Sequence, residues 1–514
     1  MRFDKHILSI SLLVGALAYT LWFVFAGFGN HQDPLYWLYK YEHLEGGWMA
    51  VGTLLTGGLV VKLFGALLLP LRLFGWLCTT VAIALPYVCL LDKEQRRENI
   101  HWLAFTYILM GYGAFQEFSP GTLSVLLLSA LWVTSVSRSP FIVRLSPVIL
   151  GLAVAARFPN ILALLVLIPL WKKRSLWNIP IAAATAGVVY LLGWWLVTPA
   201  ETDAAMNSHE MLSMLTKLWE NSGKLLGFML MAVGVLAFRE KKYAGWFVGG
   251  ALALVIIYTM KPLQWYNADI TYLLSALVLA LALAPSFFQS FNRSLIIGVA
   301  ILIVATLGTD TAWLKLFPAV LCLLPVALTQ YKTIAEQRYL YEVLVVLCVV
   351  VALRMTHNSV GQSDLTKVQT FSSVSPYKGI AIRTTEEQRL LQYKADFDSL
   401  QIVESSNPYI LSIGQEMHLM RAVTGCEAAK YNEFWSNIFD SVYMAKYRDI
   451  IEAEHPIVFC SFSPQFKTKP VYQDRESALE NMLREQGYRE IDRSKYKYMI
   501  YIPQSSNRQS SNGK

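Results

Sequence analysis

The sequence predicts a polytopic α-helical membrane protein with about 13 transmembrane helices, one interfacial helix and a small C-terminal soluble α/β domain. Of its 514 residues, 55% are hydrophobic and only 16% are charged. Apolar runs recur from Leu8 to Val351, and a run of about 20 apolar residues crosses the ~30 Å hydrocarbon core of a bilayer as a helix. Beyond His357, charged residues become frequent and the apolar runs shorten to the length of strands.

The first span is predicted at residues 7–28. Its apolar run is longer than the core of a signal peptide, so we interpret it as an uncleaved helix. Each later span is an apolar run between polar loops. The predicted spans are 7–28, 71–91, 100–116, 121–137, 145–157, 160–171, 177–198, 225–238, 244–260, 269–287, 294–308, 313–329 and 339–356.

The segment Met49–Leu69 is apolar enough to span, yet it contains Lys62 and a Gly-Gly pair. The charge of the loops decides its placement. If the segment lies along the interface, the loops richest in Lys and Arg share the cytoplasmic side with the N-terminus, as the positive-inside rule requires. We therefore predict an interfacial or re-entrant helix on the outer face. The C-terminal domain then lies outside the cytoplasmic membrane.

The net charge of +8 and the pI near 9.0 do not indicate nucleic-acid binding. The basic residues are spread over short loops, and no basic soluble face with interleaved aromatic residues is present. We expect membrane lipids, and no nucleic acid, as partners.

Four parts of the chain are predicted. A transmembrane domain occupies residues 1–356, a linker 357–376, an extracytoplasmic α/β domain 377–503 and a polar, disordered tail 504–514. In the α/β domain, the strand-like runs GIAIR, YILSIG, PIVFCSF and YKYMIYIP alternate with helical stretches such as EEQRLLQYKADF. It contains no Gly-rich phosphate loop, HExxH or CxxC pair, and so no chemistry of its own. Cys426 and Cys460 would either pair in an oxidising compartment or remain buried thiols.

Ionisable residues gather at the predicted outer edge of the membrane. Such groups are costly at membrane depth, which makes them candidates for function. Arg and Lys hold phosphate oxygens well, and a carboxylate can take a proton from an attacking hydroxyl. The mixture therefore suits an anionic lipid substrate with a polar head. The candidates are Asp33, Glu117, Arg157, Lys261 and Asp310.

Each candidate also has a plainer interpretation. Asp33 precedes a proline and would favour a turn, and Glu117 would be a solvated loop acid. Arg157 would reach to the lipid headgroups, Lys261 would anchor the end of a span, and Asp310 would cap a helix.

The sequence of the first loop identifies no metal ligand and allows two roles for its aromatic residues. His43 shares this loop only with His31, at a spacing that fits no familiar metal site, so no metal ligand is assigned. The aromatic residues of YWLYKY would form an interfacial belt or, as the second interpretation, a platform for a sugar.

The sequence resembles the GT-C superfamily, the membrane glycosyltransferases that use polyprenyl-phosphate sugars, such as the aminoarabinose and protein mannosyl transferases. Four features carry the resemblance: an Asp just after the first span, an aromatic loop, an apolar interfacial helix ending in PLRLFGW, and a second loop acid after the third span. The segment LGLAVAARFPNILAL is similar to the G-x-x-x-G-l-a-x-x-[KR]-[FY] segment of bacterial members. A soluble α/β domain outside the membrane also fits.

The resemblance implies roles for three of the candidates. Asp33 corresponds to the first-loop acid, the presumed catalytic base. Glu117 corresponds to the second-loop acid, which in some members helps to bind a divalent cation or to orient the acceptor. Arg157 matches the basic position of the similar segment. Lys261 and Asp310 have only positional analogues, and their assignment to substrate binding comes from their own chemistry.

This chain departs from the family in both acidic loops. Many relatives have an acidic pair where it reads GNHQDP, and its second loop reads QEFSP rather than an Asp-led motif. The departures leave open whether a divalent cation binds and whether the chain is active; no cofactor is assigned.

The expected function is transfer of a sugar from an isoprenoid-phosphate donor to an acceptor hydroxyl of a glycan, lipid or protein. It would take place with inversion at the periplasmic face of a bacterial inner membrane. The alternative is a non-enzymatic polytopic envelope transporter or lipid-handling protein, but the mid-membrane charges and internal repeats typical of transporters are not evident. A polysaccharide polymerase or ligase would be expected to have a large basic outer loop, whereas residues 201–224 are slightly acidic. The sequence fixes neither the sugar nor the acceptor.

Overall fold

The computed structural model of this chain describes residues 5–27, 32–111, 118–172, 177–199, 219, 222–258, 268–288, 292–307, 316–357, 365–404, 409–414, 419, 422–423, 427–428, 441–461, 470–491 and 499–503. The chain divides into two compact units. The first comprises residues 1–29 and 40–368, and the second comprises residues 30–39 and 369–514. The predicted linker, 357–376, contains the main division. The assignment of residues 30–39 to the second unit was not predicted.

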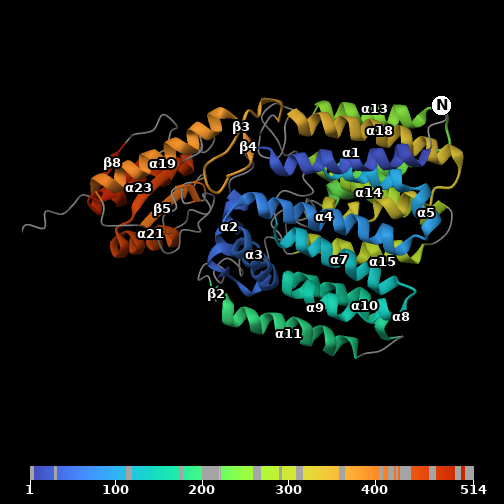
Figure 1. Cartoon of the computed structure of the whole chain (residues 1–514), viewed down its shortest axis with the longest axis horizontal. Coiled ribbons are helices and arrows are strands. Elements are labelled where there is room, and N and C mark those ends of the chain that lie inside the picture. Colours follow the sequence, from blue (N-terminus) through green and yellow to red (C-terminus); the bar gives the residue numbers. More distant parts are fainter. Residues whose placement is uncertain are drawn as a thin grey trace, which may run out of the picture. The chain divides into compact units, whose positions relative to one another are not determined.

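The first unit is a bundle of apolar helices (Figure 1). Among the described residues, four helices are long and apolar enough to cross a membrane: α1 (Lys5–Phe25), α4 (Leu68–Leu90), α11 (Asn178–Leu196) and α18 (Ile334–His357). By the length and apolarity of these helices, the chain is a helical membrane protein.

Shorter helices fill the rest of the first unit. Each apolar segment predicted as a span is helical over most of its described part, while the number of helices that cross the membrane stays a prediction. The shorter elements are α6 (Ile100–Met110), α7 (Pro120–Val136), α9 (Ser146–Ala156), η2 (Phe158–Ala163), α10 (Leu164–Lys172), a helix over Ser222–Leu236, α13 (Ala244–Tyr258), α14 (Ala268–Phe288), α15 (Arg293–Leu302), η3 (Ile303–Thr306), α16 (Leu316–Leu321) and α17 (Leu324–Leu328).

The helices pack in an ordered row. α4 packs on α7, α7 on α9, and α9 on α11, while α1 packs on α6 and α13 on α18 (Figure 1). Large side chains fill the interior between them. Trp132, for example, is fully buried against Gly298, and its indole N–H donates a 2.8 Å hydrogen bond to the carbonyl oxygen of Ser294.

The two ends of the bundle differ in character. Short helices in charged or polar loops, α5 (Lys93–Glu98) and α8 (Pro140–Val143), lie at one end (Figure 1). α5 begins with a capping box between Asp92 and Gln95, which satisfies its first backbone N–H groups. The other end holds α3 (Val51–Phe64) and the short strands β1 (Glu45–Gly46) and β2 (Thr198–Pro199). Sequence analysis predicts that this second end is the outer face.

The predicted interfacial segment folds as η1 (Trp48–Ala50) followed by α3. α3 has 14 residues and ends at Gly65, whose φ of +83° favours glycine. Its length is about 21 Å, which is short of the ~30 Å hydrocarbon core. One face is buried in the bundle, whereas Leu59, Leu63 and Phe64 are 56–66% exposed. The length and the exposed apolar face agree with an interfacial helix.

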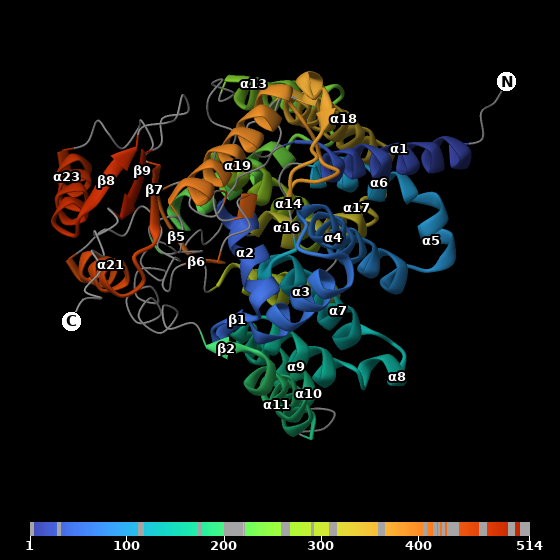
Figure 2. The ribbon, with the colours of Figure 1, turned by 60° about the vertical axis from the view of Figure 1, so that its left-hand side comes forward.

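The second unit contains a five-stranded sheet in the order β6-β5-β7-β9-β8 (Figure 2). β6 and β7 pair parallel to β5, while β9 pairs antiparallel with β7 and β8. A two-stranded ribbon, β3 with β4, precedes the first helix of the unit. The elements are β3 (Thr370–Phe371), β4 (Ala381–Ile382), α19 (Thr384–Glu404), β5 (Tyr409–Gly414), β6 (Glu427–Ala428), α21 (Ser441–Glu454), β7 (Ile457–Ser461), α23 (Pro470–Glu485), β8 (Tyr488–Ile491) and β9 (Met499–Pro503).

The strand-like runs of the sequence correspond to strands of this unit. GIAIR contains β4, YILSIG contains β5, PIVFCSF contains β7 and YKYMIYIP contains β9. The predicted alternatives for Cys426 and Cys460 concern side chains outside the described part of the chain.

Candidate functional site

Of the five predicted site residues, Arg157 has a described side chain. Asp33 is the second residue of helix α2 (Gln32–His43), and its side chain is outside the described part of the chain. Glu117, Lys261 and Asp310 also lie outside the described residues. Their neighbours in the sequence are described, however, and these neighbours show which loops come together.

The aromatic stretch after the first span forms a helix rather than a loop. Pro34 lies in the first turn of α2, where its fixed φ and missing N–H are well tolerated. Because a helix puts successive side chains on different faces, the rings are not equivalent. Tyr41 is 1% exposed and belongs to the core, so it is not part of the expected interfacial belt.

Tyr41 connects the end of α2 to the residue that follows Glu117. Its hydroxyl donates a 3.1 Å hydrogen bond to the carbonyl oxygen of Phe118, and the two rings lie 5.9 Å apart. The backbone N–H of Phe118 donates a 3.0 Å hydrogen bond to the carbonyl oxygen of Leu71, in α4. Phe118 directly follows Glu117 in the chain. Phe118 is therefore attached both to Tyr41 of α2 and to the start of α4.

The chain that enters the first loop is attached at the same place. Gly27, just after α1, accepts a 2.9 Å hydrogen bond from Nη1 of Arg72, the residue after Leu71. Gly27 is thus tied directly to the Leu71–Arg72 turn of α4, and Tyr41 is tied to the same turn through Phe118. We refer to Gly27, Tyr41, Leu71, Arg72 and Phe118 as the loop anchor.

Helix α3 joins the loop anchor to the end of α9. A Cβ at Gly57 would overlap the ring of Tyr41, so the ring lies directly on the backbone of α3. Five residues earlier, a Cβ at Gly52 would lie 2.9 Å from the backbone nitrogen of Ala156. Thr53 also donates a 2.8 Å hydrogen bond to the carbonyl oxygen of Ala156. The two contacts are about 7.5 Å apart along the helix.

Arg157 follows α9 with an extended backbone and is 6% exposed. Its guanidinium donates hydrogen bonds of 2.6 Å to the carbonyl oxygen of Ala305 and 2.5 Å to that of Leu307, at the end of η3. The carbonyls at a helix end lack partners within the helix, so these bonds satisfy them. The side chain is therefore buried against η3 instead of reaching out to the headgroups. Leu307 lies three residues before Asp310, so the Asp310 loop starts beside Arg157.

The residues around Arg157 are held by a buried network. The Asn160 amide, which is fully buried, donates a 2.8 Å hydrogen bond to the carbonyl oxygen of Ala153 and accepts one of 2.9 Å from the Ser124 hydroxyl. Phe158 packs edge-on against Trp48 of η1, with ring centroids 4.7 Å apart. The ARFPN segment is thus fixed on both sides.

A short parallel pairing fixes the far side of the first loop. Glu45 pairs with Thr198 in β1 and β2, and the Thr198 N–H donates a 2.8 Å hydrogen bond to the carbonyl oxygen of Leu44. The end of α11 and the start of the long outer loop therefore lie beside α3.

Sequence analysis missed two buried cations near the loop anchor. Lys40, which precedes Tyr41, is 2% exposed, and Arg72 is 6% exposed. Burying a cation is costly unless an anion or a hydrogen bond compensates it. Lys40 was overlooked because it lies within YWLYKY, which was interpreted as an aromatic belt. Arg72 could have been recognised, because PLRLFGW places a charge inside an apolar run.

Lys40, Arg72 and Arg157 are buried cations in the described part of this end of the bundle. Positive side chains are the usual partners of phosphate groups. Among the residues that the structure describes, no three His, Cys, Asp or Glu side chains gather as the ligands of a metal would.

No protein-family model matches the chain, and no curated protein is similar to it in sequence. A solved structure to which the chain is similar is that of ArnT from Cupriavidus metallidurans bound to undecaprenyl phosphate. The similarity covers 97% of this chain and 98% of that chain, with 11% identity and a TM-score of 0.48. At that identity and TM-score, the similarity assigns no activity to this chain.

Proposed function

We propose that the protein transfers a sugar from an isoprenoid-phosphate-linked donor to an acceptor hydroxyl. The reaction would take place with inversion at the periplasmic face of a bacterial inner membrane. The observation that carries the proposal is the loop anchor, in which Tyr41 donates a hydrogen bond to Phe118, the residue after Glu117, and Phe118 donates one to Leu71 of α4. This supports the proposal that the two loop acids serve one site.

The position of α3 supports a donor that stays in the bilayer. Leu59, Leu63 and Phe64 are exposed on α3, while Gly57 and Gly52 of the same helix contact Tyr41 and the end of α9. An isoprenoid chain would lie along the exposed face, and its phosphate would pass the end of the helix to Arg157. Lys261 and Asp310, from later outer loops, would contact the substrates there.

The chemistry requires one base and one group that stabilises the leaving phosphate. Asp33 would take the proton of the acceptor hydroxyl as its oxygen attacks the anomeric carbon. The bond from that carbon to the phosphate oxygen breaks, and the isoprenoid phosphate leaves with the electron pair. Arg157 would stabilise the charge that develops on it. Glu117 would orient the acceptor. A single displacement of this kind inverts the anomeric centre.

The test is transfer of radiolabelled sugar from a set of undecaprenyl-phosphate donors, in membranes that contain the wild type, Asp33→Asn or Glu42→Gln. Asp33→Asn preserves size and removes the base, so we expect transfer to fall by about 10²-fold or more. Glu42 is an exposed acid of the same helix, and its replacement should leave transfer unchanged. Full activity of a well-inserted Asp33→Asn variant would contradict the assignment of the base. If the wild type transfers from no donor, the envelope transporter is favoured.

A further inference from the structure

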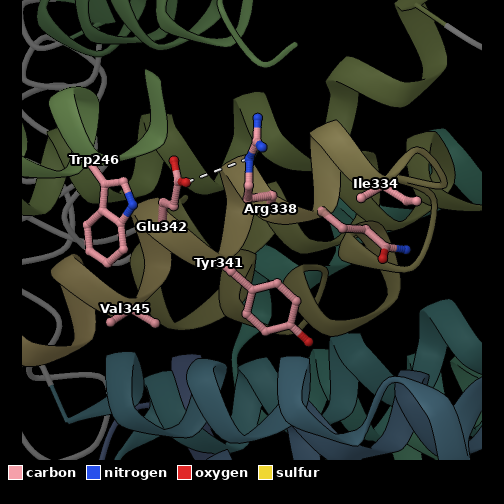
Figure 3. A pocket seen from close by; sticks show the side chains of 7 residues that line it. Trp246, Ile334, Arg338, Tyr341, Glu342 and Val345 are labelled. Carbon is pink, nitrogen blue, oxygen red and sulfur yellow. Dashed lines mark ion pairs between the residues drawn. The ribbon is translucent and has the colours of Figure 1, made fainter. Parts of the chain in front are cut away.

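A concave site lies in the first unit, at the end of the bundle opposite α3. It is a pocket of about 420 Å³ on one face of α18, covered at one side by α13 (Figure 3). The His101 ring, near α5, stacks at 5.0 Å on Tyr341, a lining residue, which places the pocket at the α5 end. Its lining includes Trp246 of α13 and Gln337, Arg338, Tyr341, Glu342 and Val345 of α18.

Glu342 is the unusual member of the lining. It is 6% exposed, and its Oε1 lies 3.8 Å from Nε of Arg338. Its Oε2 is buried and has no hydrogen-bond partner among the described residues. α13 passes directly over the carboxylate, because a Cβ at Gly245 would lie 2.6 Å from Oε2. A buried carboxylate with a single loose ion pair is costly, so a further hydrogen-bond donor is expected.

Arg338 provides the opposite charge at the open side of the pocket. Its side chain is 42% exposed, and a guanidinium has five N–H donors in a planar arrangement that suits phosphate. Figure 3 shows Arg338 and Glu342 side by side on α18. Trp246 of α13 and Val345 of α18 lie beyond Glu342. Trp246 and Val345 are 49% and 36% exposed and form an apolar wall next to the charged pair.

We propose that this pocket binds a phospholipid whose headgroup carries a primary ammonium. The ammonium donates to the Glu342 carboxylate, the phosphodiester accepts from Arg338, and the start of an acyl chain contacts Trp246 and Val345. The paired charges of the pocket match a zwitterion. A quaternary ammonium has no N–H to donate, and an anionic headgroup without an amine leaves Glu342 uncompensated. The site lies at the other end of the bundle from the loop anchor and does not depend on the proposed function.

The first test needs no variant. Binding to the full-length wild type in detergent is measured by native mass spectrometry for lipids with identical dioleoyl chains. The series runs from phosphatidylethanolamine through its N-methyl and N,N-dimethyl derivatives to phosphatidylcholine, with phosphatidylglycerol beside it. We expect phosphatidylethanolamine to bind about tenfold more tightly than phosphatidylcholine or phosphatidylglycerol, with a stepwise decline on methylation. Equal binding across the series would overturn the proposal, and so would full competition by millimolar inorganic phosphate.

Variants then test which side chain of the pocket causes the preference for phosphatidylethanolamine. Glu342→Gln should abolish the preference for phosphatidylethanolamine, whereas Arg338→Gln should weaken all phospholipids together. Glu240→Gln is the matched control, since Glu240 is an acid near the same end whose side chain is 71% exposed and does not line the pocket. A folded Glu342→Gln protein that still prefers phosphatidylethanolamine would refute the site. If that variant does not fold, the methylation series on the wild type decides alone.

Discussion

The hydroxyl of Tyr41 donates a 3.1 Å hydrogen bond to the carbonyl oxygen of Phe118, 77 residues later in the chain. Tyr41 and Phe118 are 1% and 0% exposed, so water cannot replace the bond. It links the end of α2 to the residue that directly follows Glu117 in the chain.

Tyr41→Phe should separate the role of this bond from the role of the ring. The ring stays on Gly57, while the Phe118 carbonyl loses its donor, so we expect a loss of about 1–3 kcal/mol of stability. Sugar transfer should fall as well, because the two loops are less well fixed. Thermal unfolding in detergent and the transfer assay measure the two effects.

Tyr331→Phe is the control for that change. The Tyr331 hydroxyl donates a 2.9 Å buried hydrogen bond to the carbonyl oxygen of Leu281, away from the loop anchor. Its loss should cost a similar stability and leave transfer intact. Equal loss of transfer in the two variants would mean that activity only follows stability.

Gly57→Ala should disturb the loop anchor from the side of α3. The added methyl group would overlap the Tyr41 ring, and overpacking of this kind costs about 1–3 kcal/mol. We expect a lower thermal midpoint and reduced transfer. Gly187→Ala, in α11, has nothing within 4 Å of the new methyl group. It should be neutral or stabilise by up to about 1 kcal/mol. A Gly57→Ala protein with wild-type stability and activity would contradict the contact.

Substitutions of Arg157 separate the effect of its charge from the effect of its hydrogen-bond geometry. Arg157→Lys retains the charge but loses the fork that reaches both Ala305 and Leu307. Arg157→Gln loses the charge as well as the fork. Because the fork is lost in Arg157→Lys and in Arg157→Gln, each variant should be less stable than the wild type. If the charge binds phosphate, Arg157→Lys should retain more donor affinity than Arg157→Gln, visible as a smaller rise in KM. The same KM in two equally folded variants would assign Arg157 a structural role alone.

The second unit should lose stability in acid through Glu387. Burial raises the pKa of this carboxyl, but hydrogen bonds from Ser372 and Ser373 outweigh it, and the net pKa lies below 4.5. The Ser373 N–H and hydroxyl donate to Oε1 at 2.9 and 2.7 Å. A depressed folded-state pKa contributes stability that is present above pH 4.5 and is lost as the pH falls through the folded pKa.

Hydrogen exchange in residues 370–400 of the full-length protein, corrected for intrinsic rates, checks this at pH 7 and in acid. Glu387→Gln should flatten the acid-induced loss of protection. Glu386 is the control of opposite sign, because burial raises its pKa above 4.5. Its contribution favours the folded state at low pH and is lost as the pH rises, so Glu386→Gln should not flatten the acid loss.

Local sequence patterns predicted most of the helices. The apolar runs predicted membrane helices by length and composition, and the Lys and Arg of the loops predict an interfacial position for Met49–Leu69. The structure ends α3 at Phe64 because Gly65 takes a positive φ. The sequence pattern contains only the glycine and not its conformation. α2 was missed because YWLYKY, with five polar or aromatic residues around Leu38, shows no simple apolar period.

The candidate site was predictable as a set of residue types and not as an arrangement. Asp33 and Glu117 could be named because acids at a membrane edge are rare. The bond from Tyr41 to Phe118 joins residues distant in sequence, and no local pattern reports such a pairing. The same holds for Arg157, whose partners are backbone carbonyls about 150 residues away.

The exposed apolar face of α3 has a consequence for how a substrate reaches the site. Leu59, Leu63 and Phe64 are the exposed apolar side chains of this helix. A lipid-linked donor that arrives there diffuses in the two dimensions of the membrane and not in three dimensions through the solvent. The quantity that sets its encounter rate is then its mole fraction among the membrane lipids. Diluting the whole membrane with buffer would leave the rate per protein unchanged, whereas diluting the donor with other lipids would lower it.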